Sequence, residues 1–304
     1  MKKSFNLSKS KTNRELLFIT LPAIIFVFIF SYIPMGGVII AFKNYKFSKG
    51  IFGSEWVGIE NFRFLLTSNT ARIVRNTIGM NSLFIISGAV ISVAFALFLF
   101  EMSGSYVKIY QTTMFIPYFF SWVVVSYIFT GFFDMDLGLI NSLLKQFGAE
   151  PIYWFNKPGY WPAILVIVHI WKSAGYGCVI YYSTLIGIDT EYYEAAKLDG
   201  ANRWQQIKNI SLPMLKPMII IIVILGIGKI FNADFGMFYF LTKDTGTLYP
   251  TTDVIDTYIF RTFRVLGDTG MSTAAGLVQS LVGFFLVLAT NLIVRKVDKD
   301  NALF

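Results

Sequence analysis

The segment Glu191–Pro217, EYYEAAKLDGANRWQQIKNISLPMLKP, is the longest polar interruption between apolar segments in the second half of the chain. Its first part has the features of a short helix. The side-chain oxygen of Asp189 or Thr190 can cap that helix, because it accepts from a backbone N–H that has no partner within the helix. Residues recur at helical spacing, and the two alanines among them leave a face small enough for close docking. The set is Tyr192, Ala195, Ala196 and Asp199.

The second part of the segment is a further amphipathic piece. Gly200 permits a backbone turn between the two parts that a residue with a Cβ would resist. The second piece carries Trp204, Ile207 and Ile210 on one side, with Arg203, Lys208 and Asn209 elsewhere. We expect Pro213 to end it, with a membrane helix beginning in the apolar run that follows. An alternative for the whole segment is a helix that lies on the bilayer surface.

The composition is that of a membrane protein. The chain is 55% hydrophobic and 14% charged, with a mean hydropathy of +0.60, whereas soluble domains carry about 25% charged residues. The net charge of +8 fits an anionic membrane face better than nucleic acid, because no basic cluster lies on a soluble domain. Cys178 is the only cysteine, so an intramolecular disulfide is excluded, and its apolar surroundings predict a buried, inert thiol.

Hydropathy and length predict an all-α, polytopic membrane protein with about six spans. The first apolar run, at about 40 Å as a helix, is too long for a signal peptide. An even number of spans puts both termini on one side, and the basic residues before the first span favour the cytoplasm. The expected spans are Leu16–Phe42, Asn76–Phe100, Tyr110–Phe133, Pro158–Ile186, Met214–Leu241 and Thr273–Val294.

Three segments between the spans carry their own patterns. An apolar stripe at helical spacing predicts a helix after the first span, either floating on the outer surface or bracing a docked partner. Its residues are Trp56, Ile59, Phe62, Leu65 and Leu66. The segments Asp134–Lys157, with Asp134, Asp136 and Asn141, and Lys243–Gly270 are expected outside. Long ordered loops are often functional, so these two either receive a delivery protein or cap the spans.

The spacing within Glu191–Pro217 resembles the coupling loop of permease subunits in bacterial ABC importers. Glu194-Ala195-Ala196 is followed by Gly200 and then by Ile210-Ser211-Leu212-Pro213. In that family a short helix docks into a cleft on a separate ATPase. The resemblance implies that Glu194 contacts the ATPase, that the two alanines allow close approach, and that Gly200 sets the turn. The implied coupling set is Glu194, Ala195, Ala196, Asp199, Gly200, Ile210, Leu212 and Pro213.

Other segments extend the resemblance over nearly the whole chain. Those near the first span look like the opening of carbohydrate-importer permeases: Tyr32–Gly37, Ala41–Lys43 and Trp56–Phe62. Others are similar to the LplB/YteP-like subgroup: Asn76-Thr77, Gln111-Thr112, Ile116-Pro117, Ile170–Lys172 and Asp253–Tyr258. One departure is Gly36-Gly37, where a tyrosine-glycine pair is common. The subgroup resembles the maltose permeases in its type I importer fold, and it implies an oligosaccharide or polysaccharide-fragment cargo.

The resemblance also implies an organisation of the chain and its partners. It predicts a cytoplasmic basic tail over 1–15, a first span with an outer amphipathic segment over 16–75, a core permease domain over 76–297 with the coupling loop at 187–213, and a cytoplasmic tail over 298–304. The location is the bacterial cytoplasmic membrane, with both termini in the cytoplasm. The expected partners are a second homologous permease in a heterodimer, an ABC ATPase dimer, an extracellular lipid-anchored solute-binding protein, the carbohydrate cargo and membrane lipids, but no nucleic acid.

No catalytic or cofactor site is expected on this chain. Gly226, Gly228 and Lys229 approach a phosphate-binding loop, but Val223 and Ile230 replace the glycine and the Ser/Thr that the motif requires. ATP and magnesium are therefore expected on the partner ATPase. A metal site is not expected either, because the chain has one histidine and one cysteine.

Polar side chains within the spans predict a substrate pathway, because a charge in the bilayer usually faces a cavity or a partner. Aromatic faces and amide or carboxylate groups suit sugars. The candidates are Asn81, Ser121, Trp122, His169, Trp171, Lys172, Tyr176, Asn232, Asp234 and Gln279. Each also has a structural interpretation: Lys172 and Asp234 neutralise each other, and His169 and the two tryptophans pack.

Other function classes remain at this point. The coupling motif alone does not exclude an ABC permease for an amino acid, a peptide or phosphate. A standalone secondary transporter predicts inverted repeats and helices broken at matching places, which the sequence does not display. A membrane-embedded enzyme needs a cluster of nucleophiles or metal ligands, for which His169 and Cys178 are too little.

Overall fold

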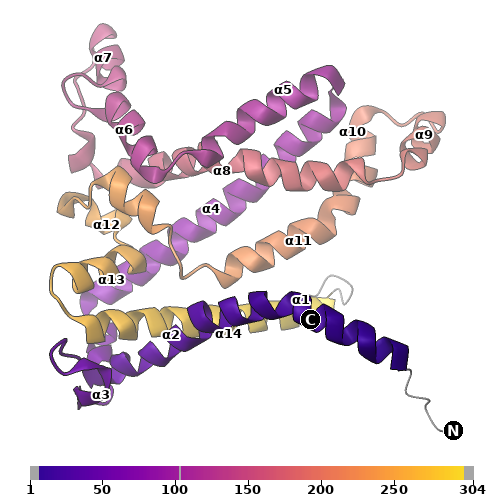
Figure 1. The fold of residues 1–304 in the computed structure, drawn as a ribbon. Coiled ribbons are helices and arrows are strands. Elements are labelled where there is room, and N and C mark those ends of the chain that lie inside the picture. The colour runs from indigo at the N-terminus through magenta and orange to yellow at the C-terminus, as the bar shows by residue number, and fades with distance from the viewer. Residues whose placement is uncertain (1–6, 103, 298–304) are drawn as a thin grey trace. The chain divides into compact units, whose positions relative to one another are not determined.

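The computed structural model describes residues 7–102 and 104–297, and almost all of its regular structure is helical (Figure 1). Its contacts divide the chain into two compact units. The first comprises Met1–Leu65 and Thr262–Leu277, and the second comprises Leu66–Arg261 and Val278–Phe304. The long C-terminal helix α14 (Thr269–Val297) begins in the first unit and continues into the second.

The first unit is built around one long apolar helix that changes its winding along its length. It comprises α1 (Leu7–Val27), the π-helical turn η1 (Phe28–Tyr32), α2 (Ile33–Met35) and the 3-10 helix η2 (Gly36–Phe42). The apolar stretch Leu16–Phe42 has 27 residues and is long enough to cross a membrane, as predicted. Its side chains are largely exposed on the isolated chain, as befits a span that faces lipid or another subunit.

The helix expected over Trp56 to Leu66 is formed only in part, because Trp56 lies in a strand and the helical part, a 3-10 helix, begins at Glu60. The strand β1 (Lys43–Asn44) pairs antiparallel with β2 (Glu55–Trp56), the short helix α3 (Gly50–Gly53) lies between them, and the 3-10 helix η3 (Glu60–Leu66) follows. Gly58 has a φ of +62°, which is incompatible with an α-helix that continues through this residue. The buried Lys43 ammonium donates to the carbonyl of Ile51 at 2.8 Å and lies 4.9 Å from the centre of the Trp56 ring.

The second unit holds most of the membrane-spanning helices. Its α-helices are α4 (Ser68–Glu101), α5 (Gly104–Phe115), α6 (Trp122–Phe133), α7 (Leu139–Gln146), α8 (Trp161–Ile186), α9 (Thr190–Leu198), α10 (Arg203–Gln206), α11 (Leu212–Gly228), α12 (Tyr249–Thr252) and α13 (Ile255–Arg264), joined by the end of α14. Short 3-10 and π-helical turns lie between them: η4 (Ile116–Phe119), η5 (Trp154–Asn156), η6 (Pro158–Tyr160), η7 (Ile207–Ser211), η8 (Met237–Leu241) and η9 (Gly246–Leu248).

The predicted spans are confirmed in number but not in every detail. Within the described residues, five helices are long and apolar enough to cross a membrane, or six if one bent pair counts as a span. That pair is the predicted third span, which bends by 99° between Phe119 and Trp122. The predicted fifth span, Met214–Leu241, is also wrong as a single helix, because α11 ends at Gly228.

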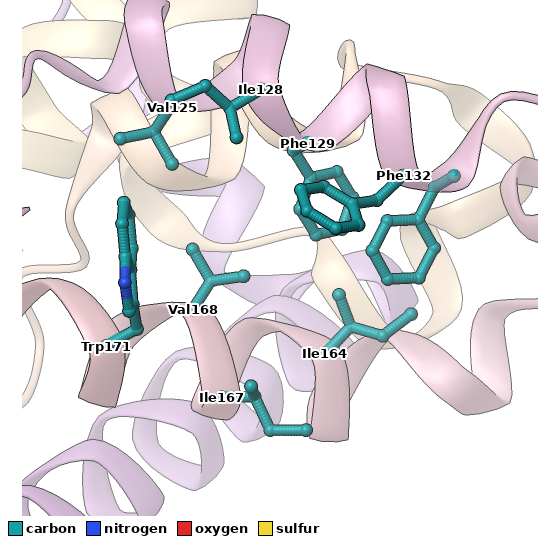
Figure 2. A pocket seen from close by; sticks show the side chains of 9 residues that line it. Val125, Ile128, Phe129, Phe132, Ile164, Ile167, Val168 and Trp171 are labelled. Atoms are coloured by element: carbon teal, nitrogen blue, oxygen red, sulfur yellow. The ribbon is translucent and has the colours of Figure 1, made fainter. Parts of the chain in front are cut away.

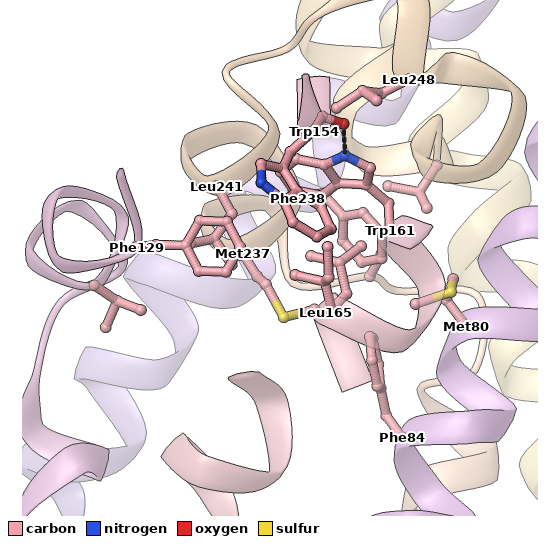
Figure 3. Close-up of a cluster of buried hydrophobic side chains, with 14 residues drawn as sticks. Met80, Phe84, Phe129, Trp154, Trp161, Leu165, Met237, Phe238, Leu241 and Leu248 are labelled. Atoms are coloured by element: carbon pink, nitrogen blue, oxygen red, sulfur yellow. Dashed lines mark hydrogen bonds between the residues drawn. The ribbon is translucent and has the colours of Figure 1, made fainter. Parts of the chain in front are cut away.

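A cluster of buried aromatic and aliphatic side chains forms the core at one end of the second unit (Figure 3). Trp161 at the start of α8 is fully buried, and its indole N–H donates to the carbonyl of Trp154 at 2.9 Å. Phe238 and Leu241 of η8 belong to the same cluster. A second cluster surrounds Cys178, and it confirms that this thiol is buried, as predicted.

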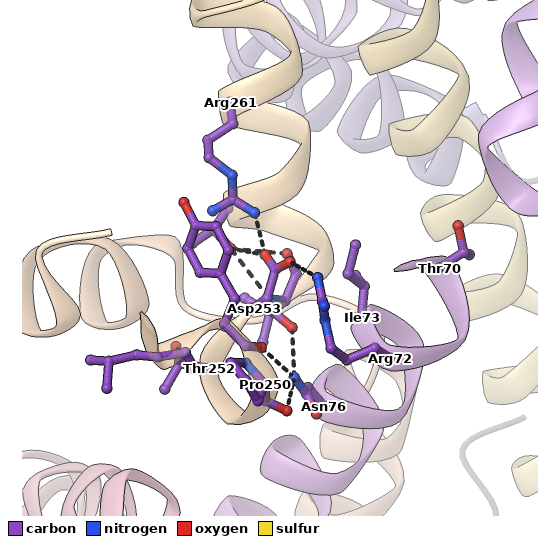
Figure 4. A network of polar contacts seen from close by, with 12 residues as sticks. Thr70, Arg72, Ile73, Asn76, Pro250, Thr252, Asp253 and Arg261 are labelled. Atoms are coloured by element: carbon purple, nitrogen blue, oxygen red, sulfur yellow. Dashed lines mark hydrogen bonds and ion pairs between the residues drawn. The ribbon is translucent and has the colours of Figure 1, made fainter. Parts of the chain in front are cut away.

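The long segment after η8 is tied to the start of α4 by a polar network (Figure 4). The buried Asp253 carboxylate forms ion pairs with Arg72 and Arg261, and Arg261 pairs with Asp244 as well. The Asn76 side-chain amide donates to the carbonyl of Asp253 at 3.2 Å. Burial lowers the pKa of Arg261, but the Asp253 and Asp244 carboxylates outweigh burial and raise that pKa above its usual value.

Candidate functional site

The helix α9 begins and ends as its sequence predicts. Asp189 is its N-cap, and the side-chain oxygen accepts from the backbone N–H of Glu191 at 3.1 Å. At the other end Gly200 has a φ of +80°. The N–H of Ala201 bonds to the carbonyl of Ala196 at 2.9 Å, and the N–H of Gly200 bonds to that of Lys197 at 3.1 Å. These two bonds form a Schellman motif, which accounts for the glycine at this position.

The second piece of the segment continues directly into the membrane helix. Asn202 and Gln205 form a reciprocal capping box at the start of α10. The prediction that Pro213 ends this piece is wrong, because α10, η7 and α11 form one candidate span over Arg203–Gly228. In the wide turn of η7 the N–H of Leu212 bonds to the carbonyl of Ile207, five residues back. This widening allows the helix to pass a proline that has no N–H to donate.

Three contacts fix α9 and α10 to the membrane helices. The Tyr193 hydroxyl lies 3.0 Å from the hydroxyl of Ser211, and both residues are buried. The Tyr193 ring packs 5.5 Å from the ring of Phe100, near the end of α4. Arg203 forms an ion pair with Glu101, the last residue of α4, at 3.1 Å. A force on α9 or α10 would therefore be transmitted to α4 and α11.

The outward face of α9 combines charge with apolar surface. In the second unit, α9 and α10 lie at the end away from α7 and α12 (Figure 1). The exposed members of the predicted coupling set are Glu194, Ala195, Asp199, Gly200 and Pro213, whereas Ala196, Ile210 and Leu212 are partly buried. Leu198 is 90% exposed and Trp204 is 70% exposed. Sequence reasoning did not include Leu198, although a large apolar residue between Lys197 and Asp199 was a signal.

A hydrogen bond between Trp122 and Asp234 joins the two interrupted spans. Ser121 caps α6 after the first break, where its hydroxyl accepts from the N–H of Val124 at 3.3 Å. Asp234 ends the second break, and its Oδ1 accepts from the N–H of Met237, the first residue of η8, at 3.2 Å. The other oxygen of Asp234 accepts from the indole N–H of Trp122 at 2.6 Å.

Side chains from distant helices satisfy the backbone of the second break. The Asn81 amide on α4 donates to the carbonyl of Ile230 at 2.8 Å, and the Gln279 amide on α14 donates to that of Phe231 at 2.5 Å. The N–H of Ala233 donates to the Asp256 carboxylate at 2.7 Å. Burial raises the pKa of Asp256, although the Ala233 bond opposes this shift. Non-helical backbone at membrane depth is tolerated when it is buried or lines a cavity, and here Lys229, Asn232 and Asp234 line a cavity.

A polar cavity of about 240 Å³ lies beside the break. It brings together four of the predicted pathway residues, Asn81, His169, Asn232 and Asp234. The His169 ring stacks on the ring of Phe84 at 4.4 Å. Lys229 also lines the cavity and was absent from the predicted pathway set. The remaining lining residues are Phe84, Ile85 and Gly226.

The other candidates on α8 face different surroundings. The Lys172 ammonium donates to the carbonyl of Tyr118 at 2.7 Å and lies over the rings of Tyr118 and Trp122. The suggested ion pair between Lys172 and Asp234 is not formed, because each group has other partners. Tyr176 stacks on Tyr118 at 4.6 Å and lines a separate cavity of about 200 Å³.

Trp171 lies about half a turn from His169 on α8 and faces a different pocket. This pocket has a volume of about 410 Å³ and lies between α6 and α8. Figure 2 shows Trp171 and Val168 of α8 opposite Val125 and Ile128 of α6. All of its lining residues are apolar or aromatic. Trp171 is therefore separated from the polar cavity that His169 lines.

Comparisons with known proteins agree on one family. Residues 88–299 match the family of binding-protein-dependent transport system inner membrane components. Protein LplB of Bacillus subtilis is 34% identical over 96% of this chain and 92% of its own. The polygalacturonan/rhamnogalacturonan transport system permease protein YteP of the same organism is 33% identical over 95% of this chain and 90% of its own. A crystal structure of a bacterial ABC transporter involved in the import of the acidic polysaccharide alginate contains a similar chain, with a TM-score of 0.85, 31% identity, and coverage of 96% of this chain and 99% of that one.

Proposed function

Because this chain belongs to the family of binding-protein-dependent transport system inner membrane components, we propose that it carries oligosaccharides or polysaccharide fragments into the cell. It is a multi-pass permease subunit of an ABC importer in the cytoplasmic membrane, and it is the non-catalytic component. Family membership excludes a standalone secondary transporter and a membrane-embedded enzyme. The names of the similar permease YteP and of the alginate transporter support a polysaccharide cargo over an amino acid, a peptide or phosphate.

The observation that best supports a coupling role is that α9 and α10 are held to the membrane helices while part of their surface stays exposed. Glu194 and Leu198 are exposed there, while Tyr193 and Arg203 hold the same segment to α4 and α11. An ATPase that docks on this face would move both helices when it closes around ATP. Glu194 provides the charged contact, and Ala195 allows close approach.

The polar cavity beside the broken fifth span is a candidate for part of the cargo path. Asn232 and His169 offer hydrogen-bonding groups to sugar hydroxyls. In alternating access the binding protein delivers the cargo while the path faces outward, and hydrolysis returns the path to the inward-facing state. The chain performs no covalent chemistry in this cycle.

The complete importer includes subunits that this chain does not replace. Its family works with a binding protein and with further ABC transporter components. We infer that these are a second, related permease, two ATPase subunits and a lipid-anchored binding protein. Both termini of this chain then lie in the cytoplasm, on the same side as α9 and α10.

Purification of the chain from its native membrane in mild detergent tests this proposal. A second permease and an ATPase should be recovered with it, and polysaccharide fragments should stimulate ATP hydrolysis once the assembly and its binding protein are placed in liposomes. Stimulation by amino acids, peptides or phosphate, with none by carbohydrates, would refute the cargo assignment. Recovery of the chain alone, under conditions that preserve other ABC importers, would refute the predicted assembly.

A further inference from the structure

Lys229 lies beside the polar cavity, and its ammonium has no ion-pair partner among the described residues. It is the first residue after α11, and its exposed side chain lines the cavity of about 240 Å³. Among the described residues, no salt bridge, side-chain hydrogen bond or cation–π contact involves its ammonium group. The partial negative charge at the end of α11 favours a cation at this place, but it does not neutralise one.

Two acceptors close to Lys229 in the sequence, the Asp234 carboxylate and the Ile230 carbonyl, already have donors. Asp234 uses one carboxylate oxygen for the N–H of Met237 and the other for the indole of Trp122. The carbonyl of Ile230 accepts from the Asn81 amide. Asp234 is the one acidic residue among the described residues that line the cavity, and it forms no salt bridge with Lys229.

A second cation lies near the same group of residues. The Lys172 ammonium lies 5.2 Å from the centre of the Trp122 ring, whose indole N–H bonds to Asp234. Lys172 therefore lies near the Trp122–Asp234 bond, and Lys229 lines the same cavity as Asp234. A cation in a membrane-spanning domain usually faces a partner or a functional cavity, and a ligand with its own negative charge would supply the missing partner.

We propose that Lys229 binds the carboxylate of an acidic sugar residue, so that the cargo is an anionic, uronate-containing carbohydrate. This inference rests on the proposed function and names its cargo class. The cavity is smaller than the roughly 300–1,000 Å³ of sites for drug-sized ligands. It therefore holds about one sugar residue of a longer chain. The Asn232 amide lies in the same cavity and bonds the hydroxyls of that residue.

ATP-driven uptake of two matched probes by the complete importer tests this proposal. One probe is an oligogalacturonate, and the other is the same oligosaccharide with its carboxyl groups reduced to alcohols. The importer is reconstituted in liposomes with its binding protein, and each probe is supplied alone. Because every sample contains the same binding protein, a change in the acidic-to-neutral uptake ratio between variants reports on the permease.

The expected result is a selective loss. Lys229→Met and Lys229→Gln should lower oligogalacturonate uptake about tenfold or more, the effect expected for loss of a hydrogen bond to a charged group. Uptake of the reduced probe should change less than about twofold, the size of effect expected where no such bond is lost. Lys229→Arg should retain most of the acidic uptake. Lys108→Met removes the same charge from an exposed position on α5 outside the cavity, and should leave the ratio unchanged.

Three results would overturn the inference. They are unchanged acidic uptake in both neutral variants, an equal loss of both probes, and wild-type uptake of the reduced probe alone. The last result leaves the proposed carbohydrate function intact. The proposed function would be refuted as well if the wild-type importer hydrolysed ATP but took up neither probe and no other carbohydrate.

Discussion

Asp234 illustrates how one side chain holds two interrupted spans together. It accepts from the N–H of Met237 at the start of η8 and from the indole of Trp122 at the start of α6. The sequence marks Asp234 as unusual, because a carboxylate in an apolar run needs a partner. It does not identify the partner, because the partner lies 112 residues away in a span that was predicted to be straight. The structure therefore adds a structural role to the predicted pathway role.

Gly236 allows Trp122 to reach Asp234, and its replacement tests this arrangement. A Cβ at position 236 would lie 2.6 Å from Cδ1 of Trp122. Gly236→Ala should therefore displace the indole and lower the free energy of unfolding by about 1–3 kcal/mol. Reaction of a thiol-specific dye with the buried Cys178 during heating measures the loss, since unfolding exposes this single thiol.

The control for this variant is Gly131→Ala on α6. A Cβ at Gly131 meets nothing within 4 Å, so this change should be neutral or slightly stabilising, because alanine favours a helix more than glycine does. Equal unfolding temperatures for the two variants would show that Gly236 does not support the contact between Trp122 and Asp234.

At the scale of elements, α9 depends on a left-handed residue at its end. Gly200→Ala should cost about 1–2 kcal/mol, because a side chain disfavours a positive φ. Gly148, at the end of α7, has a φ of +76° and the same pair of hydrogen bonds, from Ala149 to Leu144 and from Gly148 to Lys145. Gly148→Ala therefore introduces the same backbone strain at the end of a different helix, and it serves as a matched control.

The two glycine variants should differ in one respect. Both should lower the thermal stability of the chain, but only Gly200→Ala should reduce recovery of the ATPase during purification in detergent. Equal ATPase recovery with Gly200→Ala and Gly148→Ala would mean that the geometry at the end of α9 does not contribute to docking.

The elements that sequence predicts well are those decided by local chemistry. Asp189 and Gly200 mark the ends of α9, and the apolar lengths around α4, α8 and α14 predict their spans. The breaks in the third and fifth spans were missed for a different reason. Hydropathy reports how favourably side chains move from water into an apolar phase. A break in a helix depends instead on whether other groups can form hydrogen bonds with the freed backbone. Here those partners are Asn81 and Gln279, on helices far away in sequence.

At the scale of the whole molecule, the buried Asp253 joins distant parts of the chain. Its ion pairs connect Arg72 at the start of α4 with Arg261 on α13. Asp253→Ala should lower the free energy of unfolding by about 3–5 kcal/mol, because removal of one partner leaves buried charge without compensation. The Cys178 labelling assay measures this loss. Asp136→Ala, at an exposed acidic residue, should change stability by less than about 0.5 kcal/mol, and a similar effect in both variants would contradict the role of Asp253.

Docking of an ATPase on α9 is the central claim, and carbohydrate-stimulated ATP hydrolysis by the reconstituted importer tests it most directly. Glu194→Lys reverses a charge on the exposed face of α9, whereas Glu150→Lys makes the same change in the exposed segment after α7. We predict that Glu194→Lys abolishes the stimulation or detaches the ATPase, and that Glu150→Lys retains both. Normal assembly together with normal stimulation in Glu194→Lys would contradict the account.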